Sequence, residues 1–230
     1  MNDISFQVYK RAAKVHRRQN LVMSPMNLVS SLSMLLLGAR GSTADALSRY
    51  LKAEEFIKFN PHLLLKNITE KVLQLNSIGH ECAFVNNIFV EEPESKMYDL
   101  QFYSRVVNFF YNSEVSQIIP NEIGNKARDL ANENVRKQTK GAVKNFLKPE
   151  ASLRVLGPIS LVSSAYFQGK WITDVSEDDL FDMNFIRFPS AERRLIRTVG
   201  INKKMNLNAG YSEELDATVT EFYAYLINNM

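Results

Sequence analysis

The chain has 230 residues, of which 45% are hydrophobic and 23% are charged, which is ordinary globular composition. Its formal net charge is +3, from 28 basic and 25 acidic side chains, and the basic clusters are short. We therefore expect no nucleic-acid partner, because such a binder shows a concentrated basic face. The most apolar stretch, residues 32–37, is too short to span a bilayer, so we expect no membrane partner either.

Apolar residues at helical spacing predict several helices in the first half of the chain. The first begins at Asn2 or Asp3, and the second follows Ser24, a good N-cap residue, with Pro25 in its first turn. Residues 21–23 between them are predicted to form a short strand. Further helices are predicted over residues 42–52 (capped by Ser42 or Thr43), 63–75, 100–110 and 121–140 (ended by Gly141).

The second helix has an unusual composition, because serines alternate with leucines along it. The helix carries leucines at positions 28, 32, 35 and 36. The serines at positions 30, 31 and 33 keep this helix slim, so we expect it to pack closely within the core.

Strand-like sequence separates the helices and then dominates the second half. Residues 82–90 (CAFVNNIFV) are rich in β-formers and almost all apolar, which is typical of a strand covered on both faces. Other strands are predicted over residues 115–119, 156–167 and 217–227, with short strand-like pieces after Trp171. Because there is no regular βαβ alternation and no linker, the sequence predicts an α+β fold in a single domain over residues 1–230.

No group of residues in the sequence matches a catalytic or metal-binding pattern. His16, His62 and His80 are isolated, so none forms a motif with a nucleophile. Cys82 is the only cysteine and is interpreted as a small buried hydrophobe. The acidic run 177–179 lacks the glycine and the spacing of a calcium loop and is interpreted as a solvated turn. We expect no enzymatic activity, no metal and no cofactor.

Residues 20–43 (NLVMSPMNLVSSLSMLLLGARGST) resemble a pattern of the serpin family: a strand, Ser-Pro, a buried helix and Leu-Gly-Ala-x-Gly-x-Thr. Four further stretches resemble serpin motifs in the right order: residues 85–89 (VNNIF), 132–143, 161–171 (LVSSAYFQGKW) and 204–221. The resemblance covers essentially the whole chain. It implies a serpin-like α+β fold, in which helices pack on a large central β-sheet.

The resemblance implies inhibition of serine proteases by a mechanical route. In serpins a protease cuts an exposed reactive loop, which then inserts into the large sheet as an extra strand and carries the acyl-enzyme with it. The loop lies near the family's C-terminus, and no stretch of this chain matches it. We therefore expect a domain that is incomplete at its C-terminus, lacks the reactive-centre bond and does not inhibit by itself. The alternative is a non-inhibitory truncated serpin that acts as a protein-binding module.

The resemblance also implies a hydrogen-bonded sheet-opening region formed by Ser24, Asn27 and Ser163. Asn27 stands where the family has a serine, and Ser163 stands where it has an asparagine, so hydrogen-bonding groups are exchanged between these two positions. Asn134 stands where the family usually has a tryptophan in the long helix, so we expect a smaller apolar contact there.

Three further expectations concern the surface and the compartment. By analogy with the family we expect an extracellular protein, with the cytoplasm as the alternative because no signal peptide is visible. Asn67 begins a sequon and is a possible glycosylation site in the secretory pathway. Because an incomplete sheet leaves unpaired edges and apolar faces, we expect marginal stability and self-association through exposed sheet edges.

Overall fold

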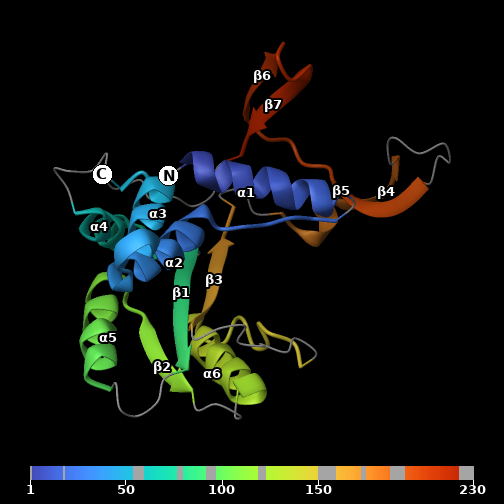
Figure 1. Cartoon of the computed structure of the whole chain (residues 1–230). Coiled ribbons are helices and arrows are strands. Elements are labelled where there is room, and N and C mark those ends of the chain that lie inside the picture. The colour runs from blue at the N-terminus through green and yellow to red at the C-terminus, as the bar shows by residue number, and fades with distance from the viewer. Residues whose placement is uncertain are drawn as a thin grey trace. The chain divides into compact units, whose positions relative to one another are not determined.

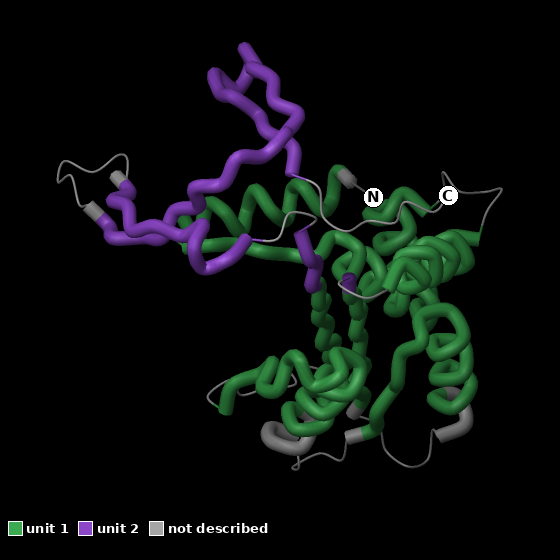
Figure 2. Tube along the Cα trace, turned by 180° about the vertical axis from the view of Figure 1, so that it is seen from behind, with its two compact units in different colours: residues 1–77, 81–167 green, residues 78–80, 168–230 purple. Residues whose placement is uncertain are grey.

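The computed structural model describes residues 2–17, 19–53, 60–76, 80–91, 97–118, 123–149, 159–171, 175–186 and 195–222. The chain, drawn in Figure 1, forms two compact units, which Figure 2 shows in different colours. Unit 1 comprises residues 1–77 and 81–167, and unit 2 comprises residues 78–80 and 168–230. The single domain over residues 1–230 stays a prediction.

Unit 1 combines helices with a three-stranded sheet. Its helices are α1 (Asn2–Val15), α2 (Pro25–Gly38), α3 (Gly41–Leu51), α4 (Pro61–Gln74), α5 (Met97–Tyr111) and α6 (Ile123–Gln138). The strands of the sheet are β1 (His80–Glu91), β2 (Glu114–Ile118) and β3 (Ile159–Gly169), in the order β2-β1-β3. β1 and β2 run parallel, with Asn87 opposite Glu114 (Figure 1).

The central strand β1 is covered on both faces, as its apolar sequence predicts. Ile88 and Val90 pack against Met34 of α2 and Val107 of α5. Phe89, which points to the opposite face, packs in a cluster with Ala131 of α6 and Val162 of β3. α2 and α5 therefore lie on one face of the sheet and α6 lies on the other.

The serines of α2 are more deeply buried than its leucines. The leucines at positions 28, 32, 35 and 36 are only half-buried, whereas Ser30, Ser31, Ser33 and Met34 are buried. Met34 packs on Ile88 and Val90 of β1, and the short Ser31 side chain lets α2 bond directly to β1 and β3. The prediction that the serines let α2 pack closely within the core is confirmed.

Three other local predictions need correction or completion. Residues 21–23 do not form a strand: Val22 is 94% exposed, and no described strand pairs with them. α3 begins at Gly41 with Arg40 as its N-cap and has no side-chain cap, so Ser42 and Thr43 lie inside its first turn. α6 ends at Gln138, and Gly141, with φ +83°, closes the following turn by donating its N–H to the Arg136 carbonyl at 2.8 Å.

Unit 2 consists of short strands, as its alternating sequence predicts. They are β4 (Leu180–Ile186), β5 (Leu195–Ile201), β6 (Asn208–Ser212) and β7 (Ala217–Glu221). β4 pairs with β5 and β6 pairs with β7, each antiparallel. The acidic run Glu177–Asp179 forms a 3-10 turn that begins after Ser176 and contains a capping box. The rest of the strand predicted to extend to residue 227 lies outside the described residues.

Candidate functional site

The three residues implied for sheet opening lie where α2 meets β3. Ser24 caps α2, because its Oγ accepts the Asn27 N–H at 3.3 Å. The Asn27 side-chain Nδ2 donates to the backbone carbonyl of Ser164 in β3. Asn27 therefore connects the helix cap to the strand, and Ser24 reaches the strand only through Asn27.

Ser163 belongs to a second set of hydrogen bonds, which joins three elements. Its hydroxyl donates to Asn86 Oδ1 of β1 at 2.7 Å. The Ser31 hydroxyl of α2 bonds to Ser163 Oγ and lies 3.4 Å from the same Asn86 oxygen. Because Ser31 and Asn86 are buried, this set ties β3 to both β1 and α2 inside unit 1.

Sequence reasoning missed Ser31, Asn86 and Ser164. Ser31 follows Asn27 by four residues, so the two share one face of the helix. Asn86 is one of two amides in an otherwise apolar run on a buried strand, and such a group requires a partner. Those two signals point to Ser31 and Asn86, but nothing in the sequence shows that the Ser164 carbonyl accepts a hydrogen bond from the Asn27 side chain.

The polar layer around β1 and β3 is incompletely satisfied. Asn27 Oδ1, Asn87 Nδ2 and Ser164 Oγ are buried and have no hydrogen-bond partner in the part of the chain that the structure describes. A buried unpaired polar group costs about 1–3 kcal/mol. The layer therefore stabilises the sheet less than a fully paired layer of the same size would.

On the other face of the sheet, α6 contacts β1 through a polar pair. Asn134, at the family's usual tryptophan position, donates from Nδ2 to Asn87 Oδ1 at 2.7 Å. A hydrogen bond thus occupies the position where an apolar contact is usual in the family.

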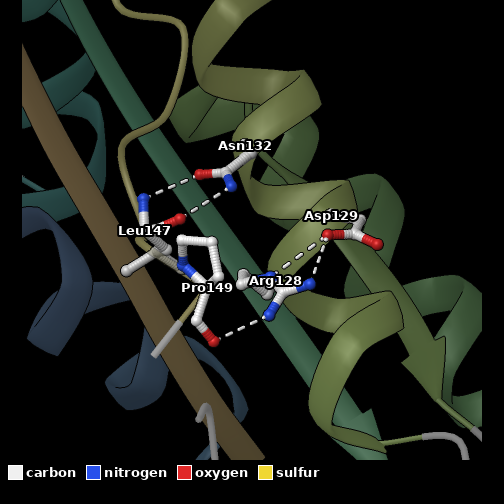
Figure 3. Close-up of polar contacts among 5 residues, drawn as sticks. All are labelled: Arg128, Asp129, Asn132, Leu147 and Pro149. Carbon is white, nitrogen blue, oxygen red and sulfur yellow. Dashed lines mark hydrogen bonds and ion pairs between the residues drawn. The ribbon is translucent and has the colours of Figure 1, made fainter. Parts of the chain in front are cut away.

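Side chains of α6 form hydrogen bonds with the backbone of the segment that follows the helix (Figure 3). Asn132 donates from Nδ2 to the Leu147 carbonyl at 2.9 Å and accepts the Leu147 N–H at 2.7 Å. Arg128 donates to the Pro149 carbonyl at 3.0 Å and forms an ion pair with Asp129. Leu147 itself packs on the cluster around Phe89, so this segment lies against both α6 and the sheet.

The histidines and the cysteine do not form a catalytic arrangement in the described structure. His62 Nδ1 lies 2.6 Å from the Tyr111 hydroxyl, and burial lowers the pKa of His62 and raises that of Tyr111. His16 is exposed and contacts Gln19, and His80 is buried. Cys82 is half-buried rather than buried, and partial burial raises the pKa of its thiol, which is opposite to the activation of a nucleophile.

Three further features bear on ligands and surface. Within the described residues, no three His, Cys, Asp or Glu side chains converge as a metal site would require. None of the helices in the described ranges is long and apolar enough to cross a membrane. Asn67 lies exposed on α4, and its glycosylation stays a prediction.

Comparison with known proteins reveals similarity along almost the whole chain. The family model described as Serpin (serine protease inhibitor) matches residues 1–224. The chain is 27% identical to human plasminogen activator inhibitor 2, over 94% of this chain and 59% of that protein. It is 26% identical to leukocyte elastase inhibitor of Xenopus tropicalis, over 94% of this chain and 55% of that protein.

Solved structures share the fold at lower identity. Human thyroxine-binding globulin has a TM-score of 0.77 and 19% identity, covering 97% of this chain and 58% of the other. Emu (Dromaius novaehollandiae) ovalbumin has a TM-score of 0.71 and 21% identity, covering 96% and 58%. This chain spans between half and three fifths of the length of these relatives and structures. The α+β serpin-like fold is confirmed, and the family is described as protease inhibitors rather than as enzymes. The chain belongs to the serpin family.

Proposed function

We propose that this protein, in a full-length form, inhibits serine proteases by inserting a cleaved reactive loop beside β3. The observation that supports this most is the set of hydrogen bonds that joins Ser163 of β3 to Asn86 and Ser31. For a new strand to enter, the sheet must open, so the contacts that hold β3 determine how readily it opens. We assign Ser24, Asn27 and Ser163 to this sheet-opening region.

The energetics of the polar layer support this role. A neutral hydrogen bond contributes a net stabilisation of about 1 kcal/mol, much less than the burial of a large apolar side chain. The unpaired atom Asn27 Oδ1 reduces the stabilisation on this side of the sheet further. β3 is therefore held specifically but weakly on its α2 side, which suits a sheet that opens.

The test is adduct formation between the full-length protein and trypsin, chymotrypsin or elastase. We expect a covalent adduct that survives SDS, because the acyl-enzyme is trapped before it hydrolyses. Ser163→Ala should change the proportions of adduct and cleaved inhibitor. Ser212→Ala in β6, whose hydroxyl accepts the Leu215 N–H, is the matched control and should leave them unchanged. Cleavage without any adduct would exclude inhibition of this kind.

A polypeptide of these 230 residues alone should form no adduct, because no stretch of it resembles a reactive loop. We also propose that it self-associates, since several aromatic side chains in unit 2 are about half-exposed, including Phe181 and Phe185. Light scattering during size-exclusion chromatography measures this directly. A monodisperse monomer would exclude self-association.

The second candidate function is a non-inhibitory serpin that binds another protein. The pairing of Asn134 with Asn87 favours it, because a part-buried amide pair stands where the family resemblance implies an apolar contact on the α6 side of the sheet. Under this alternative the full-length protein is cleaved as an ordinary substrate in the same adduct assay.

Location is also a proposal. We infer an extracellular protein by family analogy, with the cytoplasm as the alternative. The exposure of Asn67 is compatible with a glycan. A loss of mass after treatment of the natural protein with peptide N-glycosidase, abolished in Asn67→Gln, would support secretion.

A further inference from the structure

A cavity of about 1100 Å³ lies in unit 1 between α2, α3 and α5. Its lining is mainly apolar and includes Leu35, Leu47, Leu100 and Tyr103, beside Val90 near the end of β1. Small-molecule sites typically enclose about 300–1,000 Å³ and combine an apolar lining with a few polar groups. The size and the lining of this cavity are those of a site for an apolar molecule.

The α5 wall of the cavity is fixed by close packing. The Tyr103 hydroxyl donates to the Met34 carbonyl at 2.8 Å. The Tyr103 ring lies so close to Gly38 that a Cβ there would meet it at 2.8 Å. Because the ring is held from both sides, this wall is formed before any ligand arrives, which reduces the entropy lost on binding.

One end of the cavity is electropositive. Arg40 is the only charged residue among the described residues that line it; its guanidinium donates to the Ala39 carbonyl at 2.8 Å, and no described carboxylate forms an ion pair with it. Arg40 is also the N-cap of α3, which has no side-chain cap and no acidic residue in its first turn. The N–H groups at a helix start carry partial positive charge, and Ser42 and Thr43 of the first turn also line the cavity.

We propose that this cavity binds an amphiphilic carboxylate with a long apolar tail, such as a fatty acid. Its carboxylate would accept hydrogen bonds from the Arg40 guanidinium and the neighbouring hydroxyls, and its tail would lie among the leucines. A cationic amphiphile of the same length has the same tail but is repelled by Arg40. The proposal does not depend on protease inhibition, so the two can fail separately.

The test measures binding of dodecanoate to the full-length protein by isothermal titration calorimetry, below the micelle concentration. We expect Arg40→Gln to weaken dodecanoate binding about tenfold, the usual effect of losing a hydrogen bond to a charged group. Arg49→Gln removes a charge from the same helix outside the cavity and should change the affinity less than about twofold. Dodecylammonium should bind the unsubstituted protein about tenfold more weakly than dodecanoate, because the head-group contacts are lost.

A second variant tests the location of the tail. Ala46 is exposed at the cavity lining, so Ala46→Trp should fill the space without disturbing the buried core and should abolish dodecanoate binding. Circular dichroism and the melting temperature confirm that each variant is folded. The proposal is wrong if dodecanoate does not bind, if Arg40→Gln and Arg49→Gln bind it equally, or if Ala46→Trp binds it like the unsubstituted protein.

Discussion

Units 1 and 2 bury their apolar side chains to very different degrees. Every described hydrophobic residue that is buried lies in unit 1, where three clusters join the helices to one another and to the sheet. In unit 2 the side chains of Phe185, Val199 and Val219 are each more than half exposed. The difference shows that packing stabilises unit 1, whereas backbone pairing and local polar contacts hold the hairpins of unit 2.

The polar contacts of unit 2 illustrate the second kind of stabilisation. Asp179 accepts hydrogen bonds from the Ser176 N–H and hydroxyl, both at 2.8 Å, and from Lys203 at 3.1 Å. Such contacts order a turn but bury little surface, and two-stranded hairpins are only marginally stable by themselves. Substitutions should therefore have larger effects in unit 1 than equivalent substitutions in unit 2.

The largest expected difference concerns two phenylalanines. Phe89 is 1% exposed and Phe185 is 56% exposed. Phe89→Ala should lower the free energy of unfolding of the 230-residue chain by about 3–5 kcal/mol, because it leaves a cavity beneath α6. Phe185→Ala should lower it by less than about 1 kcal/mol. Urea denaturation measures both values, and equal losses would refute the contrast between the units.

A smaller difference is expected for two glycines. Alanine usually stabilises a helix relative to glycine, but a Cβ at Gly38 would lie 2.8 Å from the Tyr103 ring. Gly38→Ala should therefore cost about 1–2 kcal/mol through overpacking. Gly210 of β6 has open space around its Cβ position, so Gly210→Ala should change stability by no more than about 0.5 kcal/mol. Stabilisation by Gly38→Ala, seen as a higher melting temperature, would show that α5 yields at this contact.

The smallest expected effect concerns how stability depends on pH, because His62 of unit 1 and Asp179 of unit 2 titrate in different pH ranges. Burial lowers the pKa of His62 below 6.5, so the unfolded chain binds this proton more readily. Its contribution to stability is full above pH 6.5 and is lost as the pH falls toward the folded pKa. Hydrogen bonds from Ser176 and Lys203 lower the pKa of Asp179 from 3.8 to about 2, so its contribution is lost as the pH falls from 3.8 to 2.

Two substitutions separate these pH windows in melting curves of the full-length protein. His62→Gln should flatten the dependence of the melting temperature on pH just below 6.5, and Asp179→Asn should flatten it below 3.8. If His62→Gln leaves the first slope unchanged, then His62 is not desolvated as its contact with Tyr111 indicates.

Much of the fold follows from local sequence, because periodicity and caps act over a few residues. The apolar run of β1 and the Ser24-Pro25 start of α2 indicate their elements directly. The short apolar run 21–23 indicated a strand, but a strand also needs a partner, and none of the described strands provides one.

The candidate site was less predictable, because its contacts join residues far apart in the chain. The family resemblance implied Asn27 and Ser163, but not that Asn86 and Ser31 share hydrogen bonds with Ser163. The pairing of Asn132 with Leu147 likewise depends on how the chain returns after α6 (Figure 3). No residue pattern specifies such partners before the fold brings them together.

We propose that the sheet opens next to β3 and accepts an additional strand. Differential scanning calorimetry on the full-length protein, before and after a single proteolytic cut in the reactive loop, tests this most directly. An inserted strand adds a hydrogen-bonded ladder and buries apolar surface, so the cut protein should melt at a higher temperature than the intact one. An unchanged or lower melting temperature after the cut would contradict the claim.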